Sequence, residues 1–305
     1  MKSNKDFYAR AQSRYTNFWV TEPTTLMDFL IQKMPEASRT TIKNLLAKRL
    51  VHVDGIITKA FDYPLKAKMK VQISQDKNRK PFSSKLLDIV HEDAYFIVIN
   101  KFAGTPSSPI RGKEAKSSAL YILENYIKQY HSRRKIYPIY KLDEDYSGLM
   151  LFAKDEQTKE SFDEKWNSLV KEYTFLAICD GKPEKDSGKL ISWVVEGKTY
   201  FSNSAMSSDA IDKAETKYKM RKVLPNGQYL MEFSLLTPRR NQMKLHAKEL
   251  GCPIAGDVRY NPNSTSKQLL AHAYRLAFKH PVTNEFLQLE LPLPDYMQEK
   301  MLAPK

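Results

Sequence analysis

The chain has 305 residues, 42% of them hydrophobic and 11% aromatic, which is enough for about two folded domains and excludes a disordered protein. Lys and Arg (49) outnumber Asp and Glu (35), and the net charge of +14 favours a polyanionic partner, with a membrane surface as the competing use of that charge. No apolar run approaches the roughly 20 residues of a membrane span, and the polar start of the chain lacks a signal-peptide core, so a membrane protein is not expected. The six histidines are scattered without zinc-ligand spacing, so a metal enzyme is not expected either.

Residues 19–73 are predicted to form a small first domain that opens with two helices. Thr25 and Asp28 have the spacing of a helix-capping box, and Ser38 is a suitable N-cap for the second helix. Apolar residues at helical spacing predict one buried face for each helix, formed by Leu26, Phe29, Leu30 and Met34 in the first and by Ile42, Leu45 and Leu46 in the second. Alternation around Asp54-Gly55 then predicts a β-hairpin, and residues 66–73 a further strand.

Cations lie along the second helix and just beyond its end. Arg39 and Lys43 are four residues apart and project from one face, while Lys48 and Arg49 follow at the helix end. The helix–helix–hairpin order resembles the small RNA-binding module named after ribosomal protein S-four. The resemblance implies that Arg39, Lys43, Lys48 and Arg49 contact folded RNA, mainly at phosphates. Without it, these cations have the ordinary interpretation of a solvated helix face.

The rest of the chain divides into a linker and a larger domain. Residues 74–85 are polar, cationic and contain a proline, so an exposed and mobile linker is expected. Residues 86–302 show strands and helices without a repeated βαβ pattern, which indicates a mixed α+β domain. Strands are predicted at residues 95–99, 149–153, 174–179, 229–235 and 286–291, a helix at 158–170, and loops at 104–118 and 202–212.

Asp143 stands shortly before a Ser-Gly turn and the apolar strand predicted at residues 149–153. Its carboxylate is therefore expected at the rim of a buried sheet, where sites are commonly built. The stretch Y-K-L-D-E-D-Y-S-G-L resembles the catalytic motif of RNA pseudouridine synthases of the RluA type, usually H-R-L-D-x-x-T-S-G-L. The aspartate is kept, whereas Tyr140, Lys141 and Tyr146 replace histidine, arginine and threonine.

Further segments resemble the same family in the expected order. Lys171-Glu172-Tyr173 resembles its K-x-Y motif, and residues 235–260 resemble T-G-R-x-H-Q-I-R-x-H followed by L-G-x-P-I-x-G-D. Residues 91–106 resemble E-D-x-x-x-x-V-x-N-K-P-x-G. The resemblance implies a mixed, largely antiparallel sheet crossed by an active-site cleft. It also implies no cofactor, because isomerising uridine to pseudouridine needs neither a redox change nor external energy.

The resemblance assigns roles to individual residues. Asp143 is implied as the nucleophile, Lys244 as the cation that keeps it ionised, and Tyr173 as a ring that stacks on the flipped base and helps to move a proton from the sugar. Taken singly, these residues have ordinary interpretations: a turn-forming aspartate, a surface lysine and a core tyrosine. The substrate-binding residues are expected to be Lys141, Arg239 and Gln242.

Neighbouring polar residues are expected to have structural roles. His246 and His272 are interpreted as hydrogen-bonding residues and Asp257 as the residue that fixes a turn. Pro238 stands where the family has glycine, and Asn241 where it has histidine. These departures bear on base flipping and on the identity of the RNA site more than on the reaction.

The expected protein is thus a monomeric cytoplasmic enzyme that isomerises uridine in ribosomal or transfer RNA. Cys179 and Cys252 are isolated in the sequence, form no CxxC pair and fit buried thiols in a reducing compartment. A catalytically silent RNA-binding or ribosome-assembly factor on the same fold remains the alternative. A glycosidic hydrolase using Asp143 and Glu144 is disfavoured, because adjacent residues of a strand do not face one another.

Overall fold

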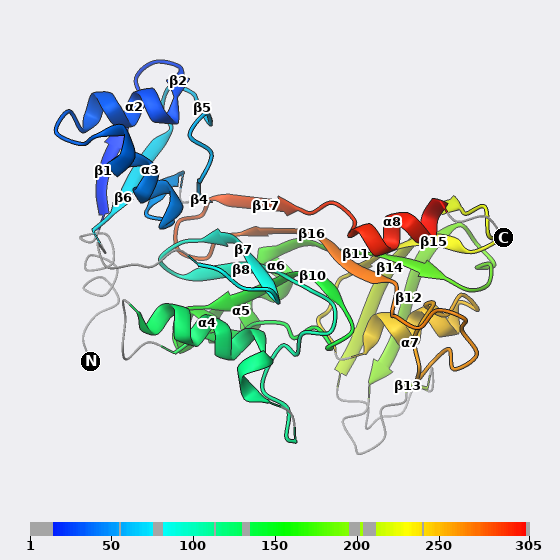
Figure 1. Ribbon diagram of the computed structural model, residues 1–305. Helices are drawn as coiled ribbons and strands as arrows, with labels where there is room; N and C mark the ends of the chain where they lie inside the picture. The colour runs from blue at the N-terminus through cyan, green and yellow to red at the C-terminus, as the bar shows by residue number, and fades with distance from the viewer. Residues whose placement is uncertain are drawn as a thin grey trace.

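Two main sheets with separate cores organise the chain (Figure 1). The computed structural model describes residues 15–54, 56–75, 82–112, 114–129, 135–194, 202–203, 212–239 and 241–302. The smaller sheet has four strands and the larger has eleven. In Figure 1 the smaller unit lies at one end of an elongated body and the C-terminal helix lies at the other. The expected mixed α+β class is confirmed.

The N-terminal unit packs two helices against its four-stranded sheet. The elements are β1 (Tyr15–Trp19), β2 (Thr24–Thr25), α2 (Leu26–Lys33), α3 (Arg39–Ala47), β3 (Val51–Val53), β4 (Ile56–Ile57), β5 (Pro64–Leu65) and β6 (Lys70–Ser74). The strand order is β1-β6-β3-β4, and β2 pairs separately with β5. The unit begins with β1 at Tyr15, ahead of the expected start at residue 19.

The two predicted helices and the hairpin of this unit are confirmed. Thr25 accepts a hydrogen bond from the backbone N–H of Asp28 and donates to its carboxylate, and Ser38 accepts one from Thr41. The caps satisfy amide groups that a helix cannot pair internally. The apolar faces that follow them meet in the core of the unit, which includes Leu26, Phe29, Leu30, Ile42 and Leu46.

The larger sheet is antiparallel at every pairing except one. Its elements are β7 (Leu87–Glu92), β8 (Phe96–Lys101), β9 (Tyr137–Pro138), β10 (Ser147–Ala153), β11 (Val170–Cys179), β12 (Ser187–Val194), β13 (Ser202–Asn203), β14 (Asp212–Val223), β15 (Tyr229–Leu235), β16 (Ala271–Lys279) and β17 (Phe286–Glu290). The order is β13-β12-β14-β15-β11-β16-β10-β8-β7, with β17 on β16 and β9 on β10. The expected mixed, largely antiparallel sheet is confirmed.

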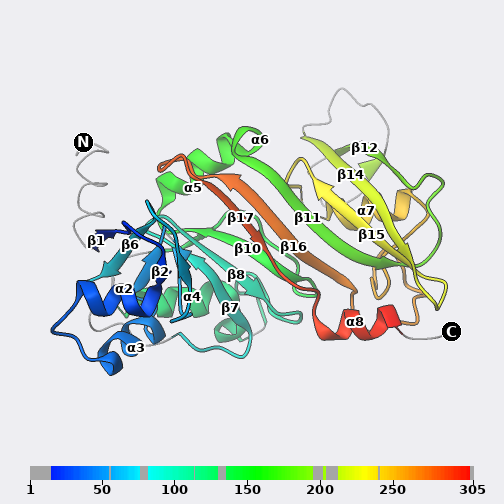
Figure 2. The ribbon, with the colours of Figure 1, turned by 90° about the horizontal axis from the view of Figure 1, so that it is seen from above.

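Helices flank this sheet (Figure 2). They are the short 3₁₀ turn η1 (Ala115–Ser117) and the helices α4 (Ala119–Lys128), α5 (Glu156–Glu164), α6 (Trp166–Leu169), α7 (Gln242–Glu249) and α8 (Asp295–Leu302). The single helix expected at residues 158–170 is wrong in extent. Asp155 caps a helix that ends at Glu164, a short second helix follows Lys165, and Val170 already belongs to β11.

The two halves of the larger sheet meet where β10 touches β16. This parallel contact joins only Ser147 to His272 and Gly148 to Ala273. A Cβ atom on Gly148 would lie 2.3 Å from the carbonyl oxygen of Ala273, and the φ angle of Gly148 is +113°. The sequence therefore needs glycine at this point. Asp143 lies just before this junction.

Candidate active site

Lys101 holds the loop that carries Asp143. Its side chain is fully buried at the end of β8, where it donates hydrogen bonds to the carbonyl groups of Thr105 (2.8 Å), Glu144 (2.9 Å) and Tyr146. Burial lowers the pKa of Lys101 to about 7, while the nearby acidic residues oppose that shift. No role was expected for Lys101, although a lysine at the end of an apolar strand was a signal for one.

Lys244 lies between two carboxylates. Its Nζ atom, on α7, is 3.6 Å from Oδ2 of Asp143 and 3.8 Å from Oδ2 of Asp257. The Lys244 side chain is 9% exposed and that of Asp143 33% exposed, so a buried cation stands beside an accessible carboxylate. The structure thus brings together Asp143 and Lys244, which lie about 100 residues apart in the chain.

Asp257 fixes a turn, as expected, and also faces Lys244. Its Oδ1 atom accepts hydrogen bonds from the backbone N–H groups of Arg259 (2.9 Å) and Tyr260 (3.2 Å). Its Oδ2 atom is buried and has no hydrogen-bond partner among the described residues. Lys244 is the nearby cation that compensates the charge of this carboxylate, and in return Asp257 holds the ammonium group in place.

A small pocket surrounds Asp143. It is lined by Tyr140, Lys141, Leu142, Asp143, Tyr146, Phe175, Leu235, Asn241, Gln242 and Met243. The volume is about 20 Å³, room for little more than one water molecule, so a base can enter only when the walls move. The pocket combines aromatic and aliphatic walls with polar side chains, among them one accessible carboxylate. Such a carboxylate is partly dehydrated, which suits it to act as a nucleophile.

Tyr146 forms one aromatic wall where the family motif has threonine. Nζ of Lys244 lies 5.1 Å from the centre of its ring, and the ring meets Phe175 edge-on at 6.0 Å. Burial, followed by the charge of Asp143, raises the pKa of Tyr146 well above its usual value. The hydroxyl is therefore neutral, and Tyr146 offers the pocket a ring that threonine would not.

Tyr173 lies behind this pocket and does not line it. Its hydroxyl donates a hydrogen bond to the carbonyl oxygen of Leu149 at 2.9 Å, and its ring packs on Phe175 (4.8 Å) and Tyr140 (5.5 Å). Burial raises the pKa of Tyr173 well above its usual value. The expected help in proton transfer is not supported, because a hydroxyl that is already paired with a carbonyl and hard to ionise makes a poor base.

The three expected substrate-binding residues lie in different environments. Lys141 is exposed and lines the pocket. Arg239 is partly buried, donates from Nε to the carbonyl of Lys213 (3.4 Å), and is not among the described residues that line the pocket.

The expected role of Gln242 in substrate binding is corrected, because the residue is only 1% exposed and its side-chain amide is fully hydrogen-bonded within the protein. Its amide nitrogen donates to the carbonyl of Glu215 and to Thr216, both at 2.8 Å. Its oxygen accepts from Thr237 and from the backbone of Arg239. With its polar atoms satisfied within the protein, Gln242 braces the start of α7 and has no polar group left for the substrate, although it lines the pocket.

Arg49 corrects a second expectation. Arg39 and Lys43 are exposed on α3 and Lys48 is partly buried, but the side chain of Arg49 is only 3% exposed. Its guanidinium donates to the carbonyl of Ile89 on β7 at 2.8 Å. Arg49 therefore joins the N-terminal unit to the larger sheet, where it is not available to RNA.

The two histidines have the structural roles that were expected. His246 shares hydrogen bonds with Ser192 and Thr216, each at 2.7 Å, and His272 with Ser147 at 2.8 Å. Burial lowers the pKa of each histidine to about 4, so both are neutral near pH 7. Cys179 and Cys252 are buried free thiols.

Two further findings concern the described residues as a whole. They contain no group of three or more His, Cys, Asp or Glu side chains that could hold a metal ion. They also contain no helix that is both long enough and apolar enough to cross a membrane.

Known proteins resemble this chain in sequence and in fold. The family model described as RNA pseudouridylate synthase matches residues 95–249. The Ribosomal large subunit pseudouridine synthase C of Rickettsia bellii (strain RML369-C) is 32% identical over 213 residues, covering 68% of this chain and 69% of the relative. The protein of the same name from Rickettsia felis (strain ATCC VR-1525 / URRWXCal2) is 27% identical over 281 residues, covering 90% of each chain.

The fold agrees with that of a solved relative. The structure of human RNA Pseudouridylate Synthase Domain Containing 4 aligns with a TM-score of 0.55 at 21% identity, covering 71% of this chain and 94% of the human one. The chain therefore belongs to the RNA pseudouridylate synthase family, as an RluA-type enzyme that isomerises uridine in RNA to pseudouridine.

Proposed function

We propose that the enzyme acts on ribosomal RNA and that Asp143 is its nucleophile. The two Rickettsia relatives are named for the ribosomal large subunit, which supports ribosomal over transfer RNA. The observation that carries the nucleophile is the accessible Asp143 carboxylate 3.6 Å from the buried Lys244 ammonium. This pair also favours an active enzyme over a silent RNA-binding factor on the same fold.

The proposed chemistry balances without a further reactant. The bond from C1′ of the ribose to N1 of the base breaks, the base turns, and C5 bonds to C1′. C5 then loses a proton and N1 gains one. Asp143 either attacks C1′ directly or assists formation of a glycal intermediate. Lys244 stabilises the ionised carboxylate and Asp257 positions Lys244.

The aromatic walls are proposed to hold the base. Tyr146 and Phe175 both line the Asp143 pocket, and a base that has left its stack gains contact with such rings. Tyr173 supports them from behind through its packing on Phe175. Leaving the stack costs a few kcal/mol, which favours uridines in loops or weak pairs. Lys141, exposed at the pocket, is placed to meet a phosphate.

The N-terminal unit is proposed to bind RNA. Residues 19–73 supply an S-four-like domain, residues 74–85 a linker, and residues 86–302 the catalytic domain. Arg39 and Lys43 lie exposed on α3, and Lys48 follows at its end. Phosphate contacts of this kind position an RNA without reading its sequence. We also propose a monomer located in the cytoplasm.

Cells that lack the gene and are complemented with variants test both parts of the proposal. Replacing Asp143 with Asn removes the negative charge at almost constant size, so product should fall by roughly 10³-fold or more while RNA affinity stays within about twofold. Pseudouridine is mapped by carbodiimide derivatisation across ribosomal and transfer RNA, because isomerisation leaves the mass unchanged.

Asp145→Asn is the matched control, since Asp145 is exposed two residues away and should retain activity. Persistent product from Asp143→Asn would contradict the nucleophile. Restored sites confined to transfer RNA would contradict the ribosomal substrate.

A further inference from the structure

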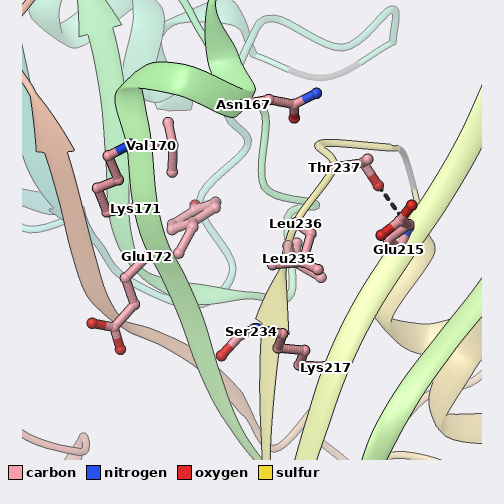
Figure 3. A pocket seen from close by; sticks show the side chains of 11 residues that line it. Asn167, Val170, Lys171, Glu172, Glu215, Lys217, Ser234, Leu235, Leu236 and Thr237 are labelled. Carbon is pink, nitrogen blue, oxygen red and sulfur yellow. Dashed lines mark hydrogen bonds between the residues drawn. The ribbon is translucent and has the colours of Figure 1, made fainter.

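A second cavity, of about 400 Å³, opens where β11 and β15 separate (Figure 3). The two strands pair from Cys179 and Tyr229 up to Thr174 and Ser234. The next residue of β15, Leu235, has no partner on β11, although β15 stays paired with β14 through Leu235 and Thr216. The strands therefore diverge, and residues of β11, β14 and β15 line the space between them.

The cavity has two carboxylates that are already neutralised. Glu215 forms ion pairs with Lys189 and Lys213, and these interactions, the one with Lys189 foremost, lower its pKa. Glu172 pairs with Arg275 at 3.1 Å. Neither carboxylate therefore leaves an uncompensated negative charge in the cavity.

The lysines that line the same cavity lack such partners in the part of the chain that the structure describes. Lys171 on β11 and Lys217 on β14 are both exposed, and neither forms an ion pair with any described residue. Two uncompensated cations at the wall of one cavity favour an anionic ligand. The apolar part of the wall includes Val170, Tyr173, Leu235 and Leu236.

This cavity adjoins the Asp143 pocket. Leu235 lines both, and Tyr173 of the cavity packs on Tyr140 of the pocket with 5.5 Å between ring centres. A strand of RNA with one nucleotide at Asp143 can therefore continue into the cavity. The volume lies within the range of small-ligand sites, about 300–1,000 Å³.

We propose that the cavity binds the nucleotide next to the target uridine in single-stranded RNA. Lys171 and Lys217 contact the phosphates on either side of this nucleotide, and the apolar wall supports its base. The proposal rests on the target uridine occupying the Asp143 pocket. It assigns the enzyme a binding site of two nucleotides in which only one undergoes reaction.

Binding of a fluorescently labelled pentauridylate to the full chain, measured by anisotropy at several salt concentrations, tests the site. Lys171→Gln combined with Lys217→Gln should raise Kd by roughly tenfold. It should also lower the slope of log K against log salt by about 0.7 for each phosphate that the protein no longer neutralises. Lys182→Gln combined with Lys219→Gln is the matched control, with the same charge change at exposed lysines just after β11 and on β14, outside the cavity. This control should leave Kd within about twofold.

Equal weakening in both double variants would overturn the site, because the lysines would then act only through overall charge. No weakening in the cavity variant, or no binding by the unaltered protein at low salt, would overturn it as well. Binding does not require the reaction, so these outcomes are distinct from failure of Asp143 as nucleophile, which is detected as product formed by Asp143→Asn.

Discussion

Two buried lysines define the surroundings of Asp143. Lys101 donates hydrogen bonds to backbone carbonyl groups of the loop that carries Asp143, and Lys244 forms an ion pair with the Asp143 carboxylate. The sequence motif around Lys244 resembles a family motif that has a cation at this position, so Lys244 could be predicted from the sequence. The role of Lys101 depends on carbonyl groups more than 40 residues away in the chain, which a motif does not reveal.

Gln242 and Arg49 show why residue roles taken from sequence can fail. Both are polar and stand in segments that resemble binding motifs, yet both are buried and hydrogen-bonded within the protein. A buried polar group must find a partner, and that partner is set by the tertiary structure. The sequence shows the donor but not the acceptor.

The two buried histidines should make the free energy of unfolding decrease at acidic pH. His246 and His272 have pKa values of about 4 in the folded protein, against an ordinary value of about 6.5. The unfolded chain therefore binds more protons below pH 6.5, and stability is lost as the pH falls from about 6.5 towards 4. Each histidine should reduce the free energy of unfolding by roughly 2 kcal/mol between pH 7.5 and pH 4.5.

Urea unfolding of the protein and of His246→Gln at these two pH values measures the effect. The variant should lose about 2 kcal/mol less on acidification, whatever its stability at pH 7.5. The same pH dependence in both proteins would show that His246 does not contribute to it.

At the scale of elements, strands with a clear apolar pattern were easier to predict than strands interrupted by polar residues, so the buried strand β16 was missed while β17 was found. The apolar run that became β10 is entirely buried, and its prediction is confirmed. β12 and β14 were not predicted, because β14 carries many charged side chains and few consecutive apolar residues. Such strands are held by pairing with their neighbours, a long-range interaction that local composition does not show.

The contact between β10 and β16 predicts that Gly148 cannot be replaced. In Gly148→Ala the new Cβ would clash with the backbone of Ala273, and the positive φ angle adds strain. The free energy of unfolding should fall by about 3 kcal/mol or more, and the displaced loop should reduce product formation as well. Chemical denaturation and a product assay measure the two effects.

Gly104→Ala is the control, since Gly104 also has a positive φ angle but has no atom within 4 Å of the added Cβ. It should cost only about 1 kcal/mol. Equal losses in the two variants would mean that backbone strain, and not the close approach of the strands, explains the need for glycine.

At the scale of the molecule, Arg49 connects the two units. β7 is the edge strand of the larger sheet, so the carbonyl of Ile89 has no neighbouring strand on that side among the described residues. The guanidinium of Arg49 occupies this position, 5.8 Å from the ring of Phe82, and β4 lies against β7. The edge is thereby covered, which protects it from pairing with another chain.

Replacing Arg49 with Ala should loosen this contact. The hydrogen bond that this change removes from a buried charged group corresponds to roughly 1.5–3 kcal/mol, so amide exchange on β7 should accelerate and the molecule should expand in small-angle scattering. Arg39→Ala, at an exposed cation of the same unit, should change neither measurement. Unchanged exchange on β7 in Arg49→Ala would show that the units are held together without it.

The sequence by itself determined the helix caps, the apolar faces and the family motifs that include Asp143 and Lys244. These features are local, since a cap or a repeating apolar face depends on residues within a few positions of one another. Only the tertiary structure decided that Asp257 faces Lys244, that Gln242 and Arg49 are buried, and that β11 and β15 diverge to form a second cavity. Each of these depends on residues far apart in the chain, whose proximity is set by strand pairing and packing.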